Sequence, residues 1–147
     1  MLLSTSGKSD NFVPLVQRRR FLKEVALAPS GRRIALRSDM EEHCLEVIDT
    51  ATGRVTATTA ISQGGTGWAL SWSPDCNYIV LVERKGFSFR EAESLREVGW
   101  LPSPYPSAVD FAKERRLVAL GDWQDGLVVP WPGILEHLAP RVTSIPT

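Results

Sequence analysis

The side chains able to act as near-neutral bases in this sequence are two histidines, His43 and His137. His43 lies in the run 39–44, where three carboxylates precede an imidazole and a thiol, all possible metal ligands. Consecutive residues of an extended segment point to opposite sides, so the run predicts a solvated loop between two strands rather than a metal site. His137 follows Glu136 near the C-terminus, and we expect it at the surface.

Other catalytic patterns are missing from the sequence. It contains no Gly-x-Ser-x-Gly elbow. The segment 64–67 is rich in glycine, but a phosphate-binding loop needs Gly-Lys-Ser/Thr opening a helix, and here the residues 68–70 open a predicted strand. We therefore expect no catalytic residue, no metal ion and no cofactor, and a protein that is not an enzyme.

Aromatic residues outside the regular apolar pattern are the stronger binding signal. Tryptophan and tyrosine dominate the energetics of protein interfaces. A proline-rich stretch over 101–106 is stiffened in advance, which lowers the ordering cost of binding. The predicted partner-binding residues are Trp68, Trp100, Tyr105 and Trp123; the alternative is that they pack between structural repeats.

Two pairs of basic residues form a second candidate contact face. Arg32 and Arg33 follow one predicted turn, and Arg115 and Arg116 follow an equivalent one. They could contact phosphates or an acidic partner, or simply keep exposed turns soluble. Lys and Arg number 17, as do Asp and Glu, and this balance argues against nucleic acid as a partner.

The composition indicates one globular domain. The 147 residues are 43% hydrophobic and 23% charged, enough to build a core. No apolar run approaches the roughly 20 residues of a membrane-spanning helix, so we expect no membrane association. The two cysteines, Cys44 and Cys76, are too few for a disulfide scaffold, and we expect free thiols and a cytoplasmic location.

A degenerate repeat organises the chain. Residues 25–36, 69–81 and 108–120 align as three copies, each a strand, a turn and a second strand. Turn residues such as Pro29 and Pro74 occupy equivalent positions in this alignment. One equivalent position is taken by Leu27, Trp72 and Phe111.

Further strands follow each copy. A third strand is predicted at 44–49, 86–90 and 125–131, and a fourth at 54–58 and 95–100. Four short strands in about 40–45 residues are typical of a propeller blade. Only residues 133–138 show a helical period.

The residues 70–75, 117–131 and 47–53 resemble WD-repeat β-propellers and their looser relatives with a Ser-Pro-Asp-Gly turn. The resemblance covers about residues 21–131. The sequence lacks the Gly-His dipeptide of the family, and Trp131 is followed by Pro132 instead of Asp. The hydrogen-bonded side-chain network of the family is therefore not expected. The resemblance implies an all-β fold of three four-stranded blades at about 21–62, 66–101 and 107–131.

Three blades cannot close a ring, since known closures take roughly four to eight. We expect the incomplete ring to be completed by a second copy or by another protein. Residues 1–11 are predicted to be a flexible tail, and 12–17 a possible latch strand that completes the last blade, including that of another copy. Residues 132–147 are predicted to be a tail or, through 141–145, a closing strand.

These expectations converge on a non-catalytic interaction scaffold or subunit of an assembly. The alternative is an oligomeric propeller that binds a small ligand or glycan by stacking on Trp68, Trp100 or Trp123. A more remote alternative is the accessory propeller of a hydrolase whose catalytic domain is another chain.

Overall fold

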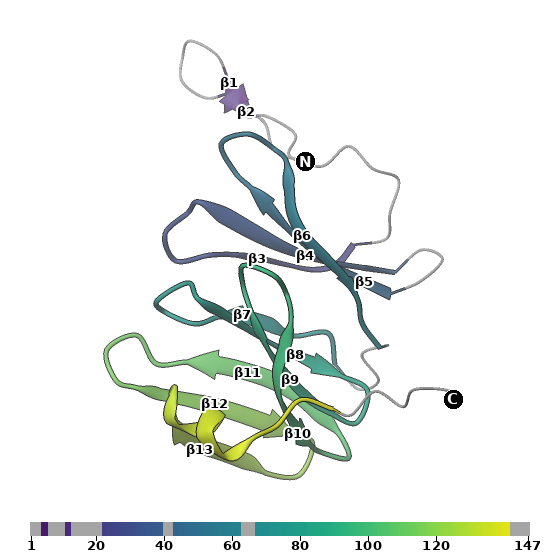
Figure 1. Ribbon diagram of the computed structural model, residues 1–147, viewed down its shortest axis with the longest axis vertical. Helices are drawn as coiled ribbons and strands as arrows, with labels where there is room; N and C mark the ends of the chain where they lie inside the picture. The colour runs from purple at the N-terminus through teal and green to yellow at the C-terminus, as the bar shows by residue number, and fades with distance from the viewer. Residues whose placement is uncertain (1–3, 6–10, 13–21, 40–42, 63–66, 142–147) are drawn as a thin grey trace.

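The computed structural model describes residues 4–5, 11–12, 22–39, 43–62 and 67–141. Three antiparallel sheets lie one above another, in chain order (Figure 1). A two-residue parallel pair, β1 (Ser4–Thr5) and β2 (Asn11–Phe12), precedes them. The predicted all-β class is confirmed.

Each sheet is one blade, with its strands in sequence order from one edge to the other. Blade 1 holds β3 (Leu22–Leu27), β4 (Arg33–Asp39), β5 (His43–Asp49) and β6 (Val55–Ala60). Blade 2 holds β7 (Leu70–Trp72), β8 (Tyr78–Glu83), β9 (Gly86–Glu91) and β10 (Glu97–Pro102). Blade 3, as described, holds β11 (Pro106–Phe111), β12 (Leu117–Asp122) and β13 (Gly126–Pro130).

The strand register confirms the predicted repeat. Leu27 lies opposite Ile34, and Trp72 lies opposite Ile79. Phe111 lies opposite Val118 in the same way. Because side chains alternate between the faces of a strand, this position points to the preceding blade in blades 2 and 3, and in blade 1 it points away from blade 2.

One apolar core fills each space between blades. Between blades 1 and 2, small residues such as Ala26 and Ala35 meet the larger Leu70 and Trp72, and the Trp72 indole N–H donates to the carbonyl of Ala26 at 2.8 Å. Between blades 2 and 3, Trp131 is central. Its ring lies edge-on to those of Tyr78 and Phe111, at centroid distances of 5.3 and 5.1 Å, among the buried Val80, Val82, Phe87, Phe89, Val118 and Leu120.

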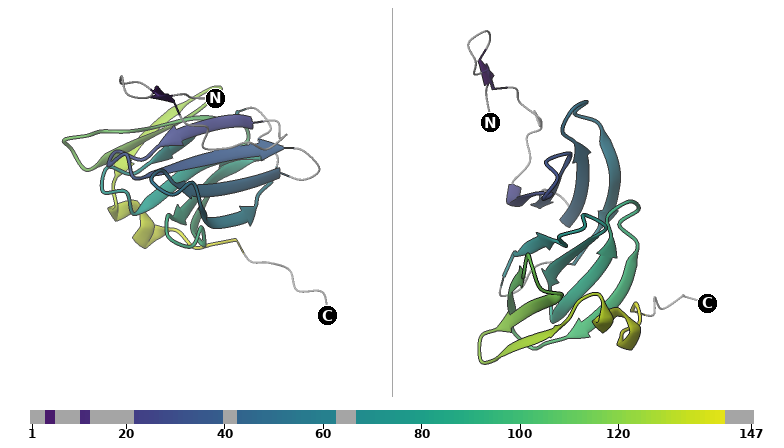
Figure 2. Two further views of the ribbon diagram at one scale, coloured as in Figure 1. Left: turned by 90° about the horizontal axis from the view of Figure 1, so that it is seen from above. Right: turned by 90° about the vertical axis from the view of Figure 1, so that its left-hand side faces the viewer.

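The chain after blade 3 turns back to blade 2. The segment with a helical period forms a short 3-10 helix, η1 (Gly133–His137), from which Ile134 and Leu135 pack on the second core. The Trp100 amide then donates to the carbonyl of Ala139 at 3.0 Å, so the chain passes along β10 (Figure 2).

The structure bears on the predicted closing strand and on the predicted position of Trp100. Arg141, the first residue of the proposed closing strand 141–145, bonds to Glu97 of β10. Residues 142–147 lie outside the described residues, as does most of the predicted tail and latch over 1–17. Trp100, expected at a strand end, lies inside β10 because the strand continues to Pro102.

Candidate functional site

Blade 1 has an apolar face turned away from blade 2. Val25 and Leu27 on this face are 46% and 59% exposed. Leu27 is the counterpart of Trp72, which is 5% exposed because blade 1 covers it. The position that forms a core in blade 2 is therefore at the surface in blade 1.

Blade 3 has a second open face with smaller side chains. Val118 and Leu120 of β12 point into the core against blade 2, so Ala119 and Gly121 point away from it. Val128, which lies opposite Ala119, is 63% exposed. Within the described part of the chain, β13 has a strand on one side only, so its outer edge offers free backbone groups.

The two open faces complement each other in size. At the junction of blades 1 and 2, the alanines of blade 1 meet the leucine and tryptophan side chains of blade 2. On the open faces, blade 3 presents Ala119 and Gly121 together with Asp110, which lies opposite Ala119, and blade 1 presents Val25 and Leu27. The open face of blade 3 can thus meet the open face of another blade 1 in the same manner.

Tyr105 and Trp123 form an exposed aromatic pair on one rim of the blades. Their rings are stacked at a centroid distance of 5.4 Å and an interplanar angle of 12°. The Trp123 amide donates to the carbonyl of Tyr105 at 3.1 Å, which joins the two loops. Trp123 is 67% exposed. Of the four predicted partner-binding residues, these two lie together with their rings at the surface.

Trp68 and Trp100 occupy different surroundings. The Trp68 ring has the ammonium of Lys23 at 5.1 Å and the guanidinium of Arg37 at 5.5 Å from its centroid. The Trp100 ring has the guanidinium of Arg141 at 3.8 Å. These cation contacts favour the alternative of packing for both residues.

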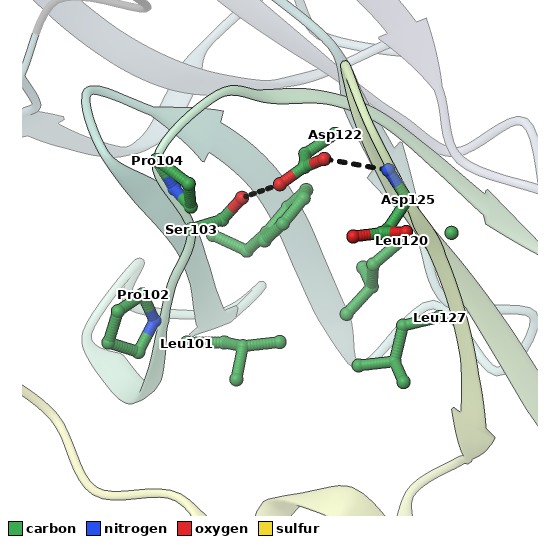
Figure 3. Close-up of a pocket in the computed structure, with 10 residues that line it drawn as sticks. Leu101, Pro102, Ser103, Pro104, Leu120, Asp122, Asp125 and Leu127 are labelled. Carbon is green, nitrogen blue, oxygen red and sulfur yellow. Dashed lines mark hydrogen bonds between the residues drawn. The ribbon is translucent and has the colours of Figure 1, made fainter.

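An apolar pocket of about 280 Å³ adjoins the aromatic pair (Figure 3). It lies between the end of β10 and the β12–β13 hairpin. Asp122 stands at one end: its carboxylate accepts from the amides of Gln124 and Asp125 and from the Ser103 hydroxyl, at 2.8–2.9 Å. The backbone hydrogen bonds above all hold the pKa of Asp122 below its usual value. The lining residues are Phe87, Leu101, Pro102, Ser103, Pro104, Leu120, Asp122, Asp125, Gly126 and Leu127.

The predicted basic residues lie at the β3–β4 and β11–β12 turns, which are on one side of the molecule (Figure 1). Arg33 is engaged between blades: it donates to the carbonyl of Cys76 at 2.9 Å, and its guanidinium lies 5.3 Å from the Trp72 ring centroid. Arg115 and Arg116 line a shallow pocket together with Asp75 and Glu114. Acidic side chains are thus interspersed with the basic ones.

A buried ion network, which the sequence-based predictions do not include, ties blade 2 to the linker from blade 1 and to the C-terminal segment. The Glu83 carboxylate accepts from the amide and hydroxyl of Ser62 at 3.0 and 2.9 Å, and from Arg90 and Arg141 at 3.1 and 3.0 Å. Burial raises its pKa, but hydrogen bonds from Ser88 and Ser62 and the two guanidinium charges lower the pKa to about 2. In the sequence, the only sign of this network is that Glu83 ends an otherwise apolar strand.

The two histidines lie at the ends of separate elements. In the ranges that the structure describes, no three His, Cys, Asp or Glu side chains gather closely enough to hold a metal ion. His43 begins β5 and His137 ends η1. No helix in the same ranges is long and apolar enough to cross a membrane.

Comparisons with known proteins identify the fold. No protein-family model and no curated protein matches the sequence. Solved structures of propeller type are similar: U3-55K (TM-score 0.66, 13% identity), BamB from Moraxella catarrhalis (0.66, 9%) and a eukaryotic initiation factor (0.61, 12%). They cover 90%, 88% and 96% of this chain, which spans only 41%, 45% and 39% of theirs. The chain therefore has the fold of part of a propeller.

Proposed function

We propose that this chain is a non-catalytic interaction scaffold built from WD-like blades, which packs face to face against further blades. The observation that carries the proposal is the pair of complementary open faces, with Leu27 exposed on blade 1 and small side chains on blade 3. Exposed faces with large apolar side chains such as Leu27 are typical of interaction sites.

A second copy is the partner that these faces favour. The large side chains of one blade 1 would fill the space above Ala119 and Gly121 of the other blade 3. Two copies would supply six blades, within the range of closed propellers. The similar structures extend well beyond the part that this chain matches, which supports an arc that needs further blades.

The mass of the purified chain in solution tests this proposal. Light scattering coupled to size exclusion should give twice the chain mass for the wild type. Leu27→Asp places a charge on the open face of blade 1 and should give a monomer. Ser30→Asp, in the adjacent exposed turn, is the matched control and should stay a dimer. A monodisperse wild-type monomer would overturn the pairing.

Trp123 favours the glycan-binding alternative as a second candidate, because the residue is 67% exposed and the ring face turned away from Tyr105 can stack on a sugar ring. Titration with a glycan panel should then change tryptophan fluorescence in the wild type but not in Trp123→Ala. No change with any glycan would exclude it.

A further inference from the structure

The pocket between β10 and β13 combines an apolar slot with an acidic end. Phe87 and Leu120 form a buried floor, at 2% and 3% exposure. Leu101 and Leu127 stand at the opposite end from the two carboxylates, Asp122 and Asp125 (Figure 3). A ligand that fills this pocket needs an apolar part and, at one end, a positive charge.

The acidic end has no basic counterpart in the pocket. All ten lining residues belong to the described chain, and none of them is Lys, Arg or His. Asp122 receives three neutral hydrogen bonds, so its negative charge is not cancelled by a cation among them. Trp123 lies between the two aspartates in sequence but does not line the pocket; one face of its ring is stacked on Tyr105, and the other can contact a cation next to the acidic end.

The neighbouring strand edge indicates that the ligand is a polypeptide. Blades 1 and 2 have four strands, and blade 3 has three among the described residues. The outer edge of β13 therefore presents backbone groups beside the pocket, and Leu127 of this strand lines it. An extended segment can pair with such an edge and place every second side chain on the pocket side.

The direction of β13 sets the order of side chains in this segment. β13 begins at Gly126, next to Asp125, and runs away from the acidic end toward Pro130. Every strand pair in the three blades is antiparallel, so an added strand would run toward Asp125. In the bound segment, read from its N-terminus, the apolar side chain therefore comes first and the charged side chain follows two residues later.

We propose that this pocket binds an extended segment of a partner protein with the pattern apolar-x-basic, which pairs antiparallel with β13. The apolar side chain packs between Leu101 and Leu127, and the Lys or Arg side chain meets Asp125 and the Trp123 ring. This inference rests on the proposed scaffold function and names the chemistry of the partner.

Fluorescence anisotropy with three labelled peptides tests the order and the charge. The probe is acetyl-Ser-Thr-Leu-Thr-Arg-Thr-Ser-amide; the controls exchange Leu with Arg, or replace Arg by Glu. Only the probe should bind, and N-methylation of the amides that face β13 should abolish its binding. Equal binding of the exchanged peptide, or of the N-methylated one, would overturn the strand pairing.

Variants of the full chain locate the site. Asp125→Asn keeps the backbone amide that Asp122 accepts from, and should weaken binding about tenfold at low salt. Leu127→Ser should weaken it by a similar factor, and Glu114→Gln, on the opposite rim, should leave it unchanged. Unchanged affinity in Asp125→Asn would overturn the site.

The outcome is independent of the mass measurement. If the chain is a dimer and does not bind the peptide, the peptide site is wrong and the proposed assembly stands. If the chain is a monomer and binds the peptide, the assembly is wrong and the peptide site stands.

Discussion

Gly31 and Cys76 occupy the same position in the first turns of blades 1 and 2, and both have a left-handed backbone, with φ of 76° and 66°. Glycine adopts this conformation without a steric penalty, whereas a residue with a Cβ atom does not. The second turn therefore contains local strain that the first turn avoids.

Cys76→Gly should relieve this strain and raise the free energy of unfolding by about 1 kcal/mol. Its carbonyl, which accepts from Arg33, is kept in the variant. Urea denaturation measures the change. Gly31→Ala is the reverse control: its added Cβ would have no atom within 4 Å, so a loss of about 1 kcal/mol would come from the backbone alone. A less stable Cys76→Gly protein would contradict the argument.

Glu83→Gln should lower the free energy of unfolding by about 3 kcal/mol, because buried Arg90 loses its nearer carboxylate, at 3.1 Å, and keeps only Glu97, at 3.6 Å. The pKa of Glu83 is lowered in the folded protein from 4.5 to about 2. Its contribution is thus complete above pH 4.5 and is lost as the pH falls toward 2. Urea denaturation from pH 6 to 2.5 should show a weaker acid dependence in the variant. Glu114→Gln, an exposed change of the same kind, is the control.

The strands were predictable because the same strand pattern occurs in three copies of the repeat. Trp72 stands at the same repeat position as Phe111 and is 5% exposed, as is Trp131 at the end of the third copy. The alternation of apolar residues in one copy supports the assignment in the others, since equivalent positions must meet equivalent neighbours.

The parts that the sequence did not reveal depend on contacts between distant segments. Glu83 and Arg141 are 58 residues apart, and no local pattern marks them as partners. The same holds for Tyr105 and Trp123: each was identified as an exposed aromatic, but their stacking depends on two loops that the blade brings together. Local periodicity carries no information on such pairings.

Gly86→Ala should destabilise blade 2 by about 2 kcal/mol or more. A Cβ atom at Gly86 would overlap the ring of Trp100 and lie 2.7 Å from the carbonyl oxygen of Leu101, which belongs to the backbone and cannot move aside easily. Thermal unfolding should report a lower midpoint. Gly126→Ala, whose added Cβ would have no atom within 4 Å, is the matched control and should change the midpoint little. Equal midpoints for both variants would contradict the proposed overlap.

Arg141 should hold the C-terminal segment against β10. Its guanidinium bonds to Glu83 and Glu97 and lies 3.8 Å from the ring centroid of Trp100. Arg141→Ala removes all three contacts, so the hydrogen bond from the Trp100 amide to Ala139 should open more often, and hydrogen exchange at that amide should accelerate at least tenfold. Arg141→Lys keeps the charge but not the planar, two-pronged geometry, and should fall between. Exchange that is accelerated equally throughout blade 2 would show global unfolding instead of release of the segment.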